Sequence, residues 1–209
     1  MCFFTQQVAI CNKVETRFSA KVDNREKFIK SDFVNGFSYP NLPVIIDEKP
    51  DIISTDFTWG LIPSWAKDDE IRKNTLNARI ETVEEKPSFK NCVNNRCLVI
   101  VTGYFEWHWN DSKGKEKEKY LINSQEDEIF CLAGLYSNWL NPSTGDIVNT
   151  YTILTTEADK TMQYVHNHKK RMPVMINRID ERKWLDDSIS IKDFAYPNYQ
   201  PNLIAFQTQ

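Results

Sequence analysis

The stretch from residue 96 to residue 156 constrains the fold most, because four strand-like segments follow one another there. Each is rich in β-branched and aromatic residues, the usual composition of β-strands. These segments are residues 96–107, 119–123, 129–139 and 149–156. The polar connections between them include "NDSKGKEKE" and "NPSTGD", which contain turn-forming Gly and Asp. Hairpin-length connections pair neighbouring strands antiparallel, so we predict a mostly antiparallel sheet or barrel.

Shorter segments on either side indicate helices and further strands. Apolar periodicity or capping residues predict helices at residues 7–18, 88–95, 156–166 and 180–187. Short apolar runs predict strands at residues 42–47, 56–66, 172–176 and 202–208. No repeat or clear linker divides the 209 residues, which suffice for one large domain. We therefore predict an α+β fold, with a compact β-rich single domain over residues 1–209 and short flanking helices.

Composition and charge exclude several classes of protein. No apolar run approaches the ~20 residues that span a bilayer, and the start lacks the pattern of a signal peptide. Five irregularly spaced cysteines favour free thiols in a reducing compartment, so we expect a cytoplasmic protein. The net charge of −3 argues against a protein coated in positive charge for duplex DNA. It leaves room for a local basic groove.

Cys2 directly follows the initiator methionine, which gives it chemistry that no internal cysteine has. Methionine is generally trimmed before a small residue, and trimming would leave an α-amine and a thiol on Cys2. With a reference pKa of ~7.7–8.0, a fair fraction of that amine is unprotonated at neutral pH. A 1,2-aminothiol condenses with an aldehyde to an imine, and the thiol then closes a thiazolidine ring. Taken alone, the position of Cys2 favours an inert terminal residue, since most cysteines at residue 2 of a protein have no chemical role.

Three further residues are candidates for proton transfer. Glu106 interrupts the aromatic segment "GYFEWHW", where it either faces water or is a carboxylic acid with a raised pKa. His166 and His168 lie in "HNHKKRMP", and histidine is the usual acid/base group near pH 7. No cysteine or histidine spacing matches a zinc site, so we predict neither a metal nor a cofactor.

Other segments offer contacts to single-stranded nucleic acid. "NARIET" contains Asn77 and Arg79, and arginine can fork onto phosphate. "WGLIPSWA" contains Trp59 and Trp65, and an exposed tryptophan can stack on an unpaired base. We expect at least one of these two tryptophans to pack in the core instead.

The motifs "MC", "WGLIPSWA", "NARIET", "GYFEW", "AGLY", "TILTTEA" and "HNHKKRMPV" occur in this order over residues 2–174. The series resembles the SRAP (SOS response-associated peptidase) family. The resemblance implies a compact β-rich fold with a positively charged groove for single-stranded DNA. It also implies that Cys2, exposed by loss of Met1, traps abasic sites as a thiazolidine crosslink that protects the lesion. Peptidase-like removal of its own leading residues and a lyase-type activity would accompany this role.

The resemblance also assigns roles to single residues. Asn77 would hold the cysteine and the sugar by hydrogen bonds, Arg79 would contact phosphate, and Glu106 would shuttle protons during opening of the sugar ring. The histidine before "RMP" would be the second acid/base. We favour His166 over His168, because His166 ends an apolar helix. Arg171 would position this histidine or contact phosphate.

Two features depart from the family pattern. The usual start C-G-R-F is replaced by "CFFT", which removes one phosphate contact and leaves Phe3 and Phe4 to stack or pack. The usual spacing H-x-R-M-P is lengthened, so both histidines lie further from Arg171. We also expect Trp59, Trp65 and His168 to contact the DNA. We further expect the protein to be a monomer and to associate with the nucleoid when it is bound to DNA.

Two alternatives to an abasic-site crosslinker stay open at this point. One is an N-terminal-nucleophile amidohydrolase, in which the Cys2 thiolate attacks an amide and the α-amine acts as base. The other is a non-covalent module for single-stranded DNA that uses only tryptophans and arginines. Binding by such a module would survive loss of Cys2 and would never become covalent.

Overall fold

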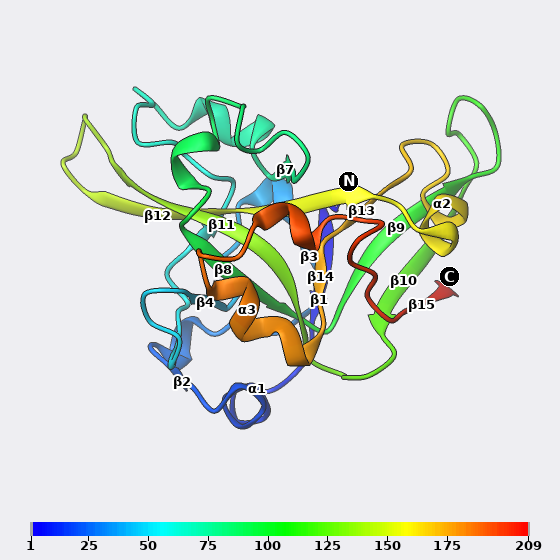
Figure 1. The fold of residues 1–209 in the computed structure, drawn as a ribbon, viewed down its shortest axis with the longest axis horizontal. Coiled ribbons are helices and arrows are strands. Elements are labelled where there is room, and N and C mark those ends of the chain that lie inside the picture. The colour runs from blue at the N-terminus through cyan, green and yellow to red at the C-terminus, as the bar shows by residue number, and fades with distance from the viewer. Residues whose placement is uncertain (1, 209) are drawn as a thin grey trace.

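The computed structural model describes residues 2–208, so Met1 and Gln209 lie outside the described part of the chain. Two curled sheets form the framework of the fold (Figure 1). The smaller sheet has five strands in the order β15, β10, β9, β1, β3. Their bounds are Leu203–Thr208, Lys117–Ser124, Gly103–Trp109, Phe4–Gln7 and Ser31–Asn35. All pairings in this sheet are antiparallel, and β1 lies between β9 and β3.

The larger sheet has eight strands. Its main path runs β13 (Arg171–Pro173), β12 (Ile147–Glu157), β11 (Phe130–Leu140), β8 (Arg96–Val101) and β4 (Val44–Ile46). Three short strands join it at the side: β6 (Thr58–Trp59), β7 (Asn77–Arg79) and β14 (Met175–Ile176). β2 (Lys21–Val22) and β5 (Ile52–Ile53) form a separate parallel pair.

Helices are few and short. They are α1 (Cys11–Phe18), α2 (Lys160–Val165) and α3 (Glu181–Leu185). Single 3₁₀ turns occur at Arg25–Lys27, Gly36–Ser38, Glu70–Asn74, Lys90–Cys92, Arg178–Asp180 and Ile191–Phe194. Within residues 2–208, no helix has the length and apolar character needed to cross a membrane.

β8 explains why the larger sheet is the centre of the fold. Its sequence "RCLVIV" is buried at every position, as expected for a strand covered on both faces. Val99 and Val101 point into the core shared with the smaller sheet, whereas Leu98 and Ile100 point into a second core. Trp184 of α3 belongs to this second core. The larger sheet is therefore sandwiched between the smaller sheet and the α3 side.

The structure confirms the predicted β-rich α+β fold with a mainly antiparallel sheet and short flanking helices. Element boundaries differ in instructive places. The predicted helix at 7–18 begins only at Cys11, because residues 4–7 are β1. The predicted helix at 156–166 begins at Lys160, after the N-cap Asp159, because β12 continues through Glu157. Of the strand predicted at 56–66, only Thr58–Trp59 is formed.

Arg96 fixes the C-terminal part of the chain to β8. Its side chain is 2% exposed, and its guanidinium donates hydrogen bonds to the carbonyls of Trp184 (3.3 Å), Asp186 (2.8 Å) and Ile189 (2.7 Å). Removing the guanidinium would leave these carbonyls short of a donor at a site that excludes water.

We expect Arg96→Met to lower the free energy of unfolding by about 3 kcal/mol, because several charge-assisted hydrogen bonds are lost together. Urea denaturation at neutral pH measures this change. Arg182→Met is the matched control, since the Arg182 side chain is 75% exposed. A loss below about 0.5 kcal/mol for Arg96→Met, the usual range for surface substitutions, would contradict the anchoring role.

Candidate active site

The start of the chain is held inside the molecule by the smaller sheet. Phe4 of β1 pairs with Phe105 of β9, and continuing this antiparallel register would place Phe3 opposite Glu106 and Cys2 opposite Trp107. On the other side of β1, the backbone N–H of Gly36 donates to the carbonyl of Phe3 at 2.8 Å. These contacts are made by backbone groups, which any side chains at residues 3 and 4 would leave available.

Asn77 provides the third contact to the chain start. It lies on β7, which pairs in parallel with β12 and places Asn77 beside Ile153. Its Nδ2 donates a hydrogen bond of 2.8 Å to the carbonyl of Cys2. Its Oδ1 is buried and has no hydrogen-bond partner among the described residues. Asn77 therefore holds Cys2 and has one acceptor available for a ligand at this point.

The Cys2 side chain is completely buried. It belongs to the core cluster that contains Trp59, Tyr104 and Tyr151, and its Sγ lies 3.9 Å from the carbonyl of Phe4. Burial raises the pKa of the thiol, and the nearby Glu106 carboxylate raises this pKa further. The thiol is thus protonated at neutral pH.

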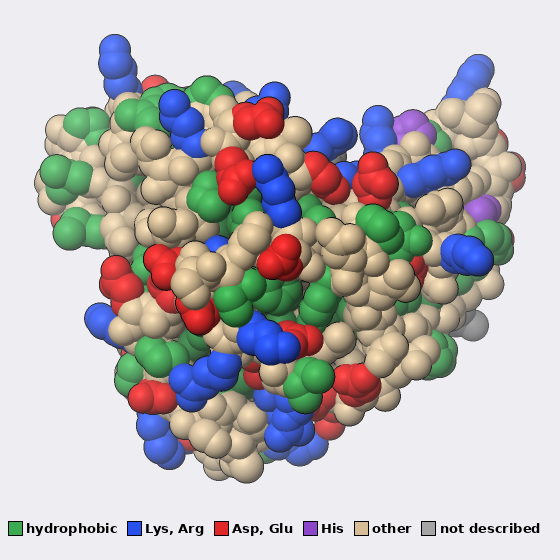
Figure 2. Space-filling model, in the orientation of Figure 1, with side chains coloured by type: hydrophobic (Ala, Val, Ile, Leu, Met, Phe, Trp, Pro, Cys, Tyr) green, Lys and Arg blue, Asp and Glu red, His purple; other side chains and the backbone are tan. Residues whose placement is uncertain are grey.

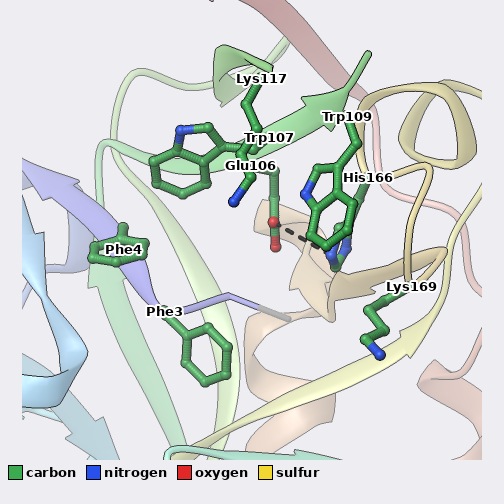
Figure 3. Close-up of a pocket in the computed structure, with 8 residues that line it drawn as sticks. All are labelled: Phe3, Phe4, Glu106, Trp107, Trp109, Lys117, His166 and Lys169. Carbon is green, nitrogen blue, oxygen red and sulfur yellow. Dashed lines mark ion pairs between the residues drawn. The ribbon is translucent and has the colours of Figure 1, made fainter. Parts of the chain in front are cut away.

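Glu106 and His166 meet in the pocket (Figure 3), and Glu106 is near enough to Cys2 to act on its thiol. Glu106 comes from β9, and His166 caps the C-terminal end of α2, with His166 Nε2 at 3.7 Å from Glu106 Oε2. His166 Nδ1 lies 2.8 Å from the carbonyl of Arg171. Because a carbonyl only accepts, Nδ1 carries the proton, and the Nε2 lone pair of the neutral ring faces Glu106.

Burial shifts these two groups in opposite directions. It raises the pKa of Glu106 to about 7, because the charged carboxylate loses its hydration. It lowers the pKa of His166 to about 4, because the charged imidazolium is likewise disfavoured. Near pH 6 the pair is therefore a carboxylic acid beside a neutral imidazole, although its geometry would also suit an ion pair. The proton resides on Glu106, where it is available for donation near neutrality.

Arg171 is engaged within the protein. Its guanidinium donates to both carboxylate oxygens of Glu81, at 2.9 and 2.8 Å, and to the carbonyl of Thr155 at 2.7 Å. The side chain is 8% exposed, so the expectation that it contacts DNA phosphate is corrected. The alternative role fits, because the Arg171 carbonyl orients the His166 ring.

A pocket of about 360 Å³ opens next to these residues. Aromatic side chains form much of its wall, Glu106 and His166 lie within it, and lysines approach it from two elements (Figure 3). The lining residues are Phe3, Phe4, Glu106, Trp107, Trp109, Lys117, His166 and Lys169. In the space-filling view, the upper surface is hollowed between the lobe that carries β7 and the arm formed by β9 and β10, with Lys and Arg side chains on both sides (Figure 2).

The other residues predicted to contact DNA differ in how far their side chains are exposed to solvent. Trp59 is completely buried, and its Nε1 donates to the carbonyl of Leu76 at 2.7 Å. It is a core residue, and the expectation that it stacks on a base is corrected. Trp65 is 53% exposed, and Arg79 is exposed on β7 two residues beyond Asn77. Both stay candidates for nucleic-acid contact.

The second histidine lies outside the proton-transfer pair. His168 is exposed, and its ring stacks on Trp109 with centroids 3.8 Å apart. His166, in contrast, is buried against Glu106. The geometry therefore favours His166 as the acid/base group and leaves His168 as an aromatic surface near the pocket.

Sequence reasoning missed four residues that line the pocket: Trp107, Trp109, Lys117 and Lys169. The two tryptophans belong to the quoted segment "GYFEWHW", and Lys117 pairs with Trp109 across the β9–β10 hairpin. The hairpin register would have revealed Lys117, but the sequence contains no signal that fixes this register. Among residues 2–208, no three His, Cys, Asp or Glu side chains gather as they would to hold a metal ion.

A strand-rich curled fold, with a buried cysteine at residue 2 beside Asn77, Glu106 and His166, defines a class of proteins whose site is built around the chain start. The family model described as SOS response associated peptidase (SRAP) matches residues 1–203. The chain therefore belongs to the SRAP family.

Two relatives carry descriptive names. The abasic site processing protein YoqW of Bacillus subtilis is 36% identical over 162 residues, which is 77% of this chain and 70% of the relative. The abasic site processing protein HMCES of Gallus gallus is 31% identical over 155 residues, which is 63% of this chain and 44% of the relative.

Solved structures match the fold over the whole chain. A crystal structure of a protein from Bacteroides thetaiotaomicron has a TM-score of 0.89 at 34% identity and covers 100% of this chain and 92% of its own. A protein from Bordetella bronchiseptica has a TM-score of 0.77 at 19% identity and covers both chains completely. The second likeness concerns the fold alone.

The opposed pKa shifts of Glu106 and His166 make a prediction about stability. In the unfolded chain near pH 5.5 the proton resides on histidine, and in the folded protein it resides on Glu106. Both states then bind one proton, so the pair adds little pH dependence to the free energy of unfolding in this range. Substituting one of the two residues should reveal the pH dependence that the other contributes to the free energy of unfolding.

For Glu106→Gln, only His166 titrates, and the unfolded chain binds more protons between pH 4 and 6.5. The free energy of unfolding should then rise with pH by about 3 kcal/mol over this window.

For His166→Gln, the folded state binds more protons than the unfolded chain between pH 4.5 and 7, so the free energy of unfolding should fall by about 3 kcal/mol as pH rises. Urea denaturation across pH 4–8 measures both slopes. His168→Gln, which alters an exposed ring, should keep the wild-type profile, and parallel profiles for all variants would refute the assignment.

Proposed function

We propose that this protein processes abasic sites in single-stranded DNA by forming a covalent crosslink through Cys2. The proposal is carried by one arrangement: Asn77 holds the carbonyl of Cys2, and the carboxyl group that acts on the Cys2 thiol, Glu106, meets His166 in the adjoining pocket. The names of its relatives support the abasic site as the substrate. The proposal includes hydrolysis of the Met1–Cys2 bond, because only a free α-amine on Cys2 can condense with an aldehyde.

The chemistry begins with the abasic sugar, which is in equilibrium between a closed hemiacetal and an open aldehyde. Ring opening moves a proton from the C1′ hydroxyl to O4′ and breaks the C1′–O4′ bond. The Cys2 amine then adds to C1′, and loss of one water gives the imine. Addition of the thiol sulfur to the same carbon, with transfer of the thiol proton to the imine nitrogen, closes the thiazolidine. The sum is aldehyde plus aminothiol giving thiazolidine plus water.

The residues of the pocket have matching proton-transfer roles. Glu106, with a pKa of about 7, donates a proton to O4′ during ring opening and recovers one from the C1′ hydroxyl. His166 is neutral at this pH, and its Nε2 lone pair accepts the proton that the attacking amine loses. Asn77 holds the Cys2 carbonyl, and its unpaired Oδ1 can accept a hydrogen bond from a sugar hydroxyl.

The state of the thiol favours this order of steps over direct attack on an amide. Burial keeps the Cys2 thiol protonated, whereas an N-terminal-nucleophile amidohydrolase needs a reactive thiolate. In the crosslinking sequence the amine reacts first, and the imine carbon that it forms is a much stronger electrophile for a neutral thiol. Arg79 and Trp65 would contact the strand around the lesion.

Denaturing gel electrophoresis with single-stranded DNA that carries one abasic site tests the proposal. Protein shown to lack Met1 should give a band that persists in denaturant, and Cys2→Ala or intact DNA should give none. Absence of the band with wild-type protein would overturn the crosslinking function. A non-covalent complex that survives Cys2→Ala would then assign the alternative of a binding module, and shortened DNA would indicate lyase-type strand cleavage.

We expect Glu106→Gln to slow crosslinking by about 10²-fold or more, because general acid catalysis typically contributes 10²–10⁴-fold. Deprotonation of the α-amine, with a reference pKa of ~7.7–8.0, increases the wild-type rate as pH rises, whereas ionisation of Glu106, with a pKa of about 7, decreases it. The two effects together should give a bell-shaped profile with its optimum between these two pKa values. Glu106→Gln should lose the alkaline decline. Single-turnover gel assays from pH 5 to 9 measure this, with Glu118→Gln as a matched control on neighbouring β10. A wild-type rate for Glu106→Gln would remove Glu106 from the mechanism.

A further inference from the structure

Five aromatic side chains form a continuous surface beside the pocket. We name Phe3, Phe4, Phe33, Phe37 and Trp107 the aromatic platform. Phe4 contacts both Phe33 and Trp107 with ring centroids 5.0 Å apart, and Phe3 contacts Phe37 at 4.9 Å. The residues come from β1, β3, the 3₁₀ turn Gly36–Ser38 and β9, so several elements build one surface.

The platform is exposed to a degree that core packing does not require. Phe33 is 43% exposed and Phe37 is 49% exposed, while Phe105, which packs against Phe33, is only 5% exposed and forms the base of the surface. Contiguous exposed apolar area of this kind marks a binding surface more often than isolated apolar residues do.

The position of the platform links it to the reactive residue. Phe3 and Phe4 directly follow Cys2 in the chain, and both line the pocket that contains Glu106 and His166. Figure 3 shows Phe3, Phe4 and Trp107 of the platform around the same pocket as Glu106, so a strand whose abasic nucleotide is joined to Cys2 would pass next to these rings.

The charges around the platform fit a polyanion. Lys119 Nζ lies 4.6 Å from the ring centroid of Phe105 and 5.4 Å from that of Phe33. Lys117 and Lys169 line the pocket, and Glu106 is the single acidic residue in its lining. Flat aromatic faces with interleaved cations are the features with which proteins bind unpaired bases and their phosphates.

We propose that the aromatic platform stacks the unpaired bases next to the abasic nucleotide and that Lys119 contacts the adjoining phosphate. This inference rests on the proposed function, and it names how this chain binds the strand around the lesion. Stacking on Phe33 and Phe37 takes over part of the affinity that a phosphate contact at residue 4 would supply. Because stacking releases no counterions, DNA binding by this protein should depend less on salt than binding through an additional arginine would.

Fluorescence anisotropy with a labelled single strand carrying one tetrahydrofuran abasic analogue measures this binding without crosslinking, since the analogue has no aldehyde. The double variant Phe33→Leu/Phe37→Leu keeps the apolar volume but removes the flat rings, and we expect it to weaken binding about tenfold. The slope of log affinity against log salt should stay unchanged. For Lys119→Gln, the slope should decrease by about 0.7, the value for one phosphate contact on a single strand.

Two controls separate stacking from structural damage. Phe206→Leu changes a 51% exposed phenylalanine on β15, at the opposite edge of the sheet from β3, and should bind like wild type. On a strand in which the nucleotides flanking the lesion are also base-free analogues, the Leu double variant and wild type should bind within about twofold of each other. Thermal unfolding confirms that the variants are folded.

Two results would overturn the inference: wild-type affinity of the folded double variant on the base-containing strand, or an equal tenfold loss on the base-free strand. Either result is independent of whether Cys2 crosslinks, because the analogue cannot react. Failure of the proposed function would instead be seen as a missing covalent band on aldehyde-containing DNA, so the two outcomes are distinguishable.

Discussion

The hydrogen bond from Asn77 to the carbonyl of Cys2, together with the backbone pairing of β1, fixes the geometry on which the site depends. Chain termini usually lie free at the surface, but here the first strand is paired on both sides within a sheet. This arrangement gives a terminal residue the positional precision of a core residue. It also places the Cys2 thiol in surroundings that raise its pKa and keep it protonated, which is why the proposed crosslinking begins at the α-amine and not at the thiol.

Burial determines the protonation of the pocket as well as its shape. The same loss of hydration raises the pKa of Glu106 and lowers that of His166, which leaves a neutral acid beside a neutral base at 3.7 Å. The Arg171 carbonyl selects the tautomer of the histidine, while the Arg171 guanidinium is neutralised by Glu81. In Arg171, therefore, the backbone carbonyl orients the histidine ring and the side chain forms an ion pair with Glu81.

Much of this site could be predicted from the sequence. The ordered motifs contain the site residues, and the β-branched and aromatic composition of the long strands predicts the sheet. Cys2, Asn77 and His166 were found in this way, and the structure brings all three together with the carboxyl group of β9. What failed depended on burial and pairing that short segments do not encode. Trp59 lies on a strand of two residues that pairs in parallel with β12, and only tertiary packing decides that its ring is inside. The partner of a buried guanidinium, such as Glu81 for Arg171, is likewise a long-range choice.

The contact from the Gly36 N–H to the Phe3 carbonyl has a consequence for how such proteins can diversify. Backbone bonds hold the chain start in register whatever side chains follow the cysteine, and a Cβ at Gly36 would lie only 3.0 Å from that carbonyl oxygen. Residues 3 and 4 are therefore free to drift over evolutionary time while the reacting atoms stay where they are. Under the proposed function, the side chains that contact the DNA strand could therefore change without moving the residues that react, and an exchange of arginine for phenylalanine at residue 4 would alter the salt dependence of binding alone.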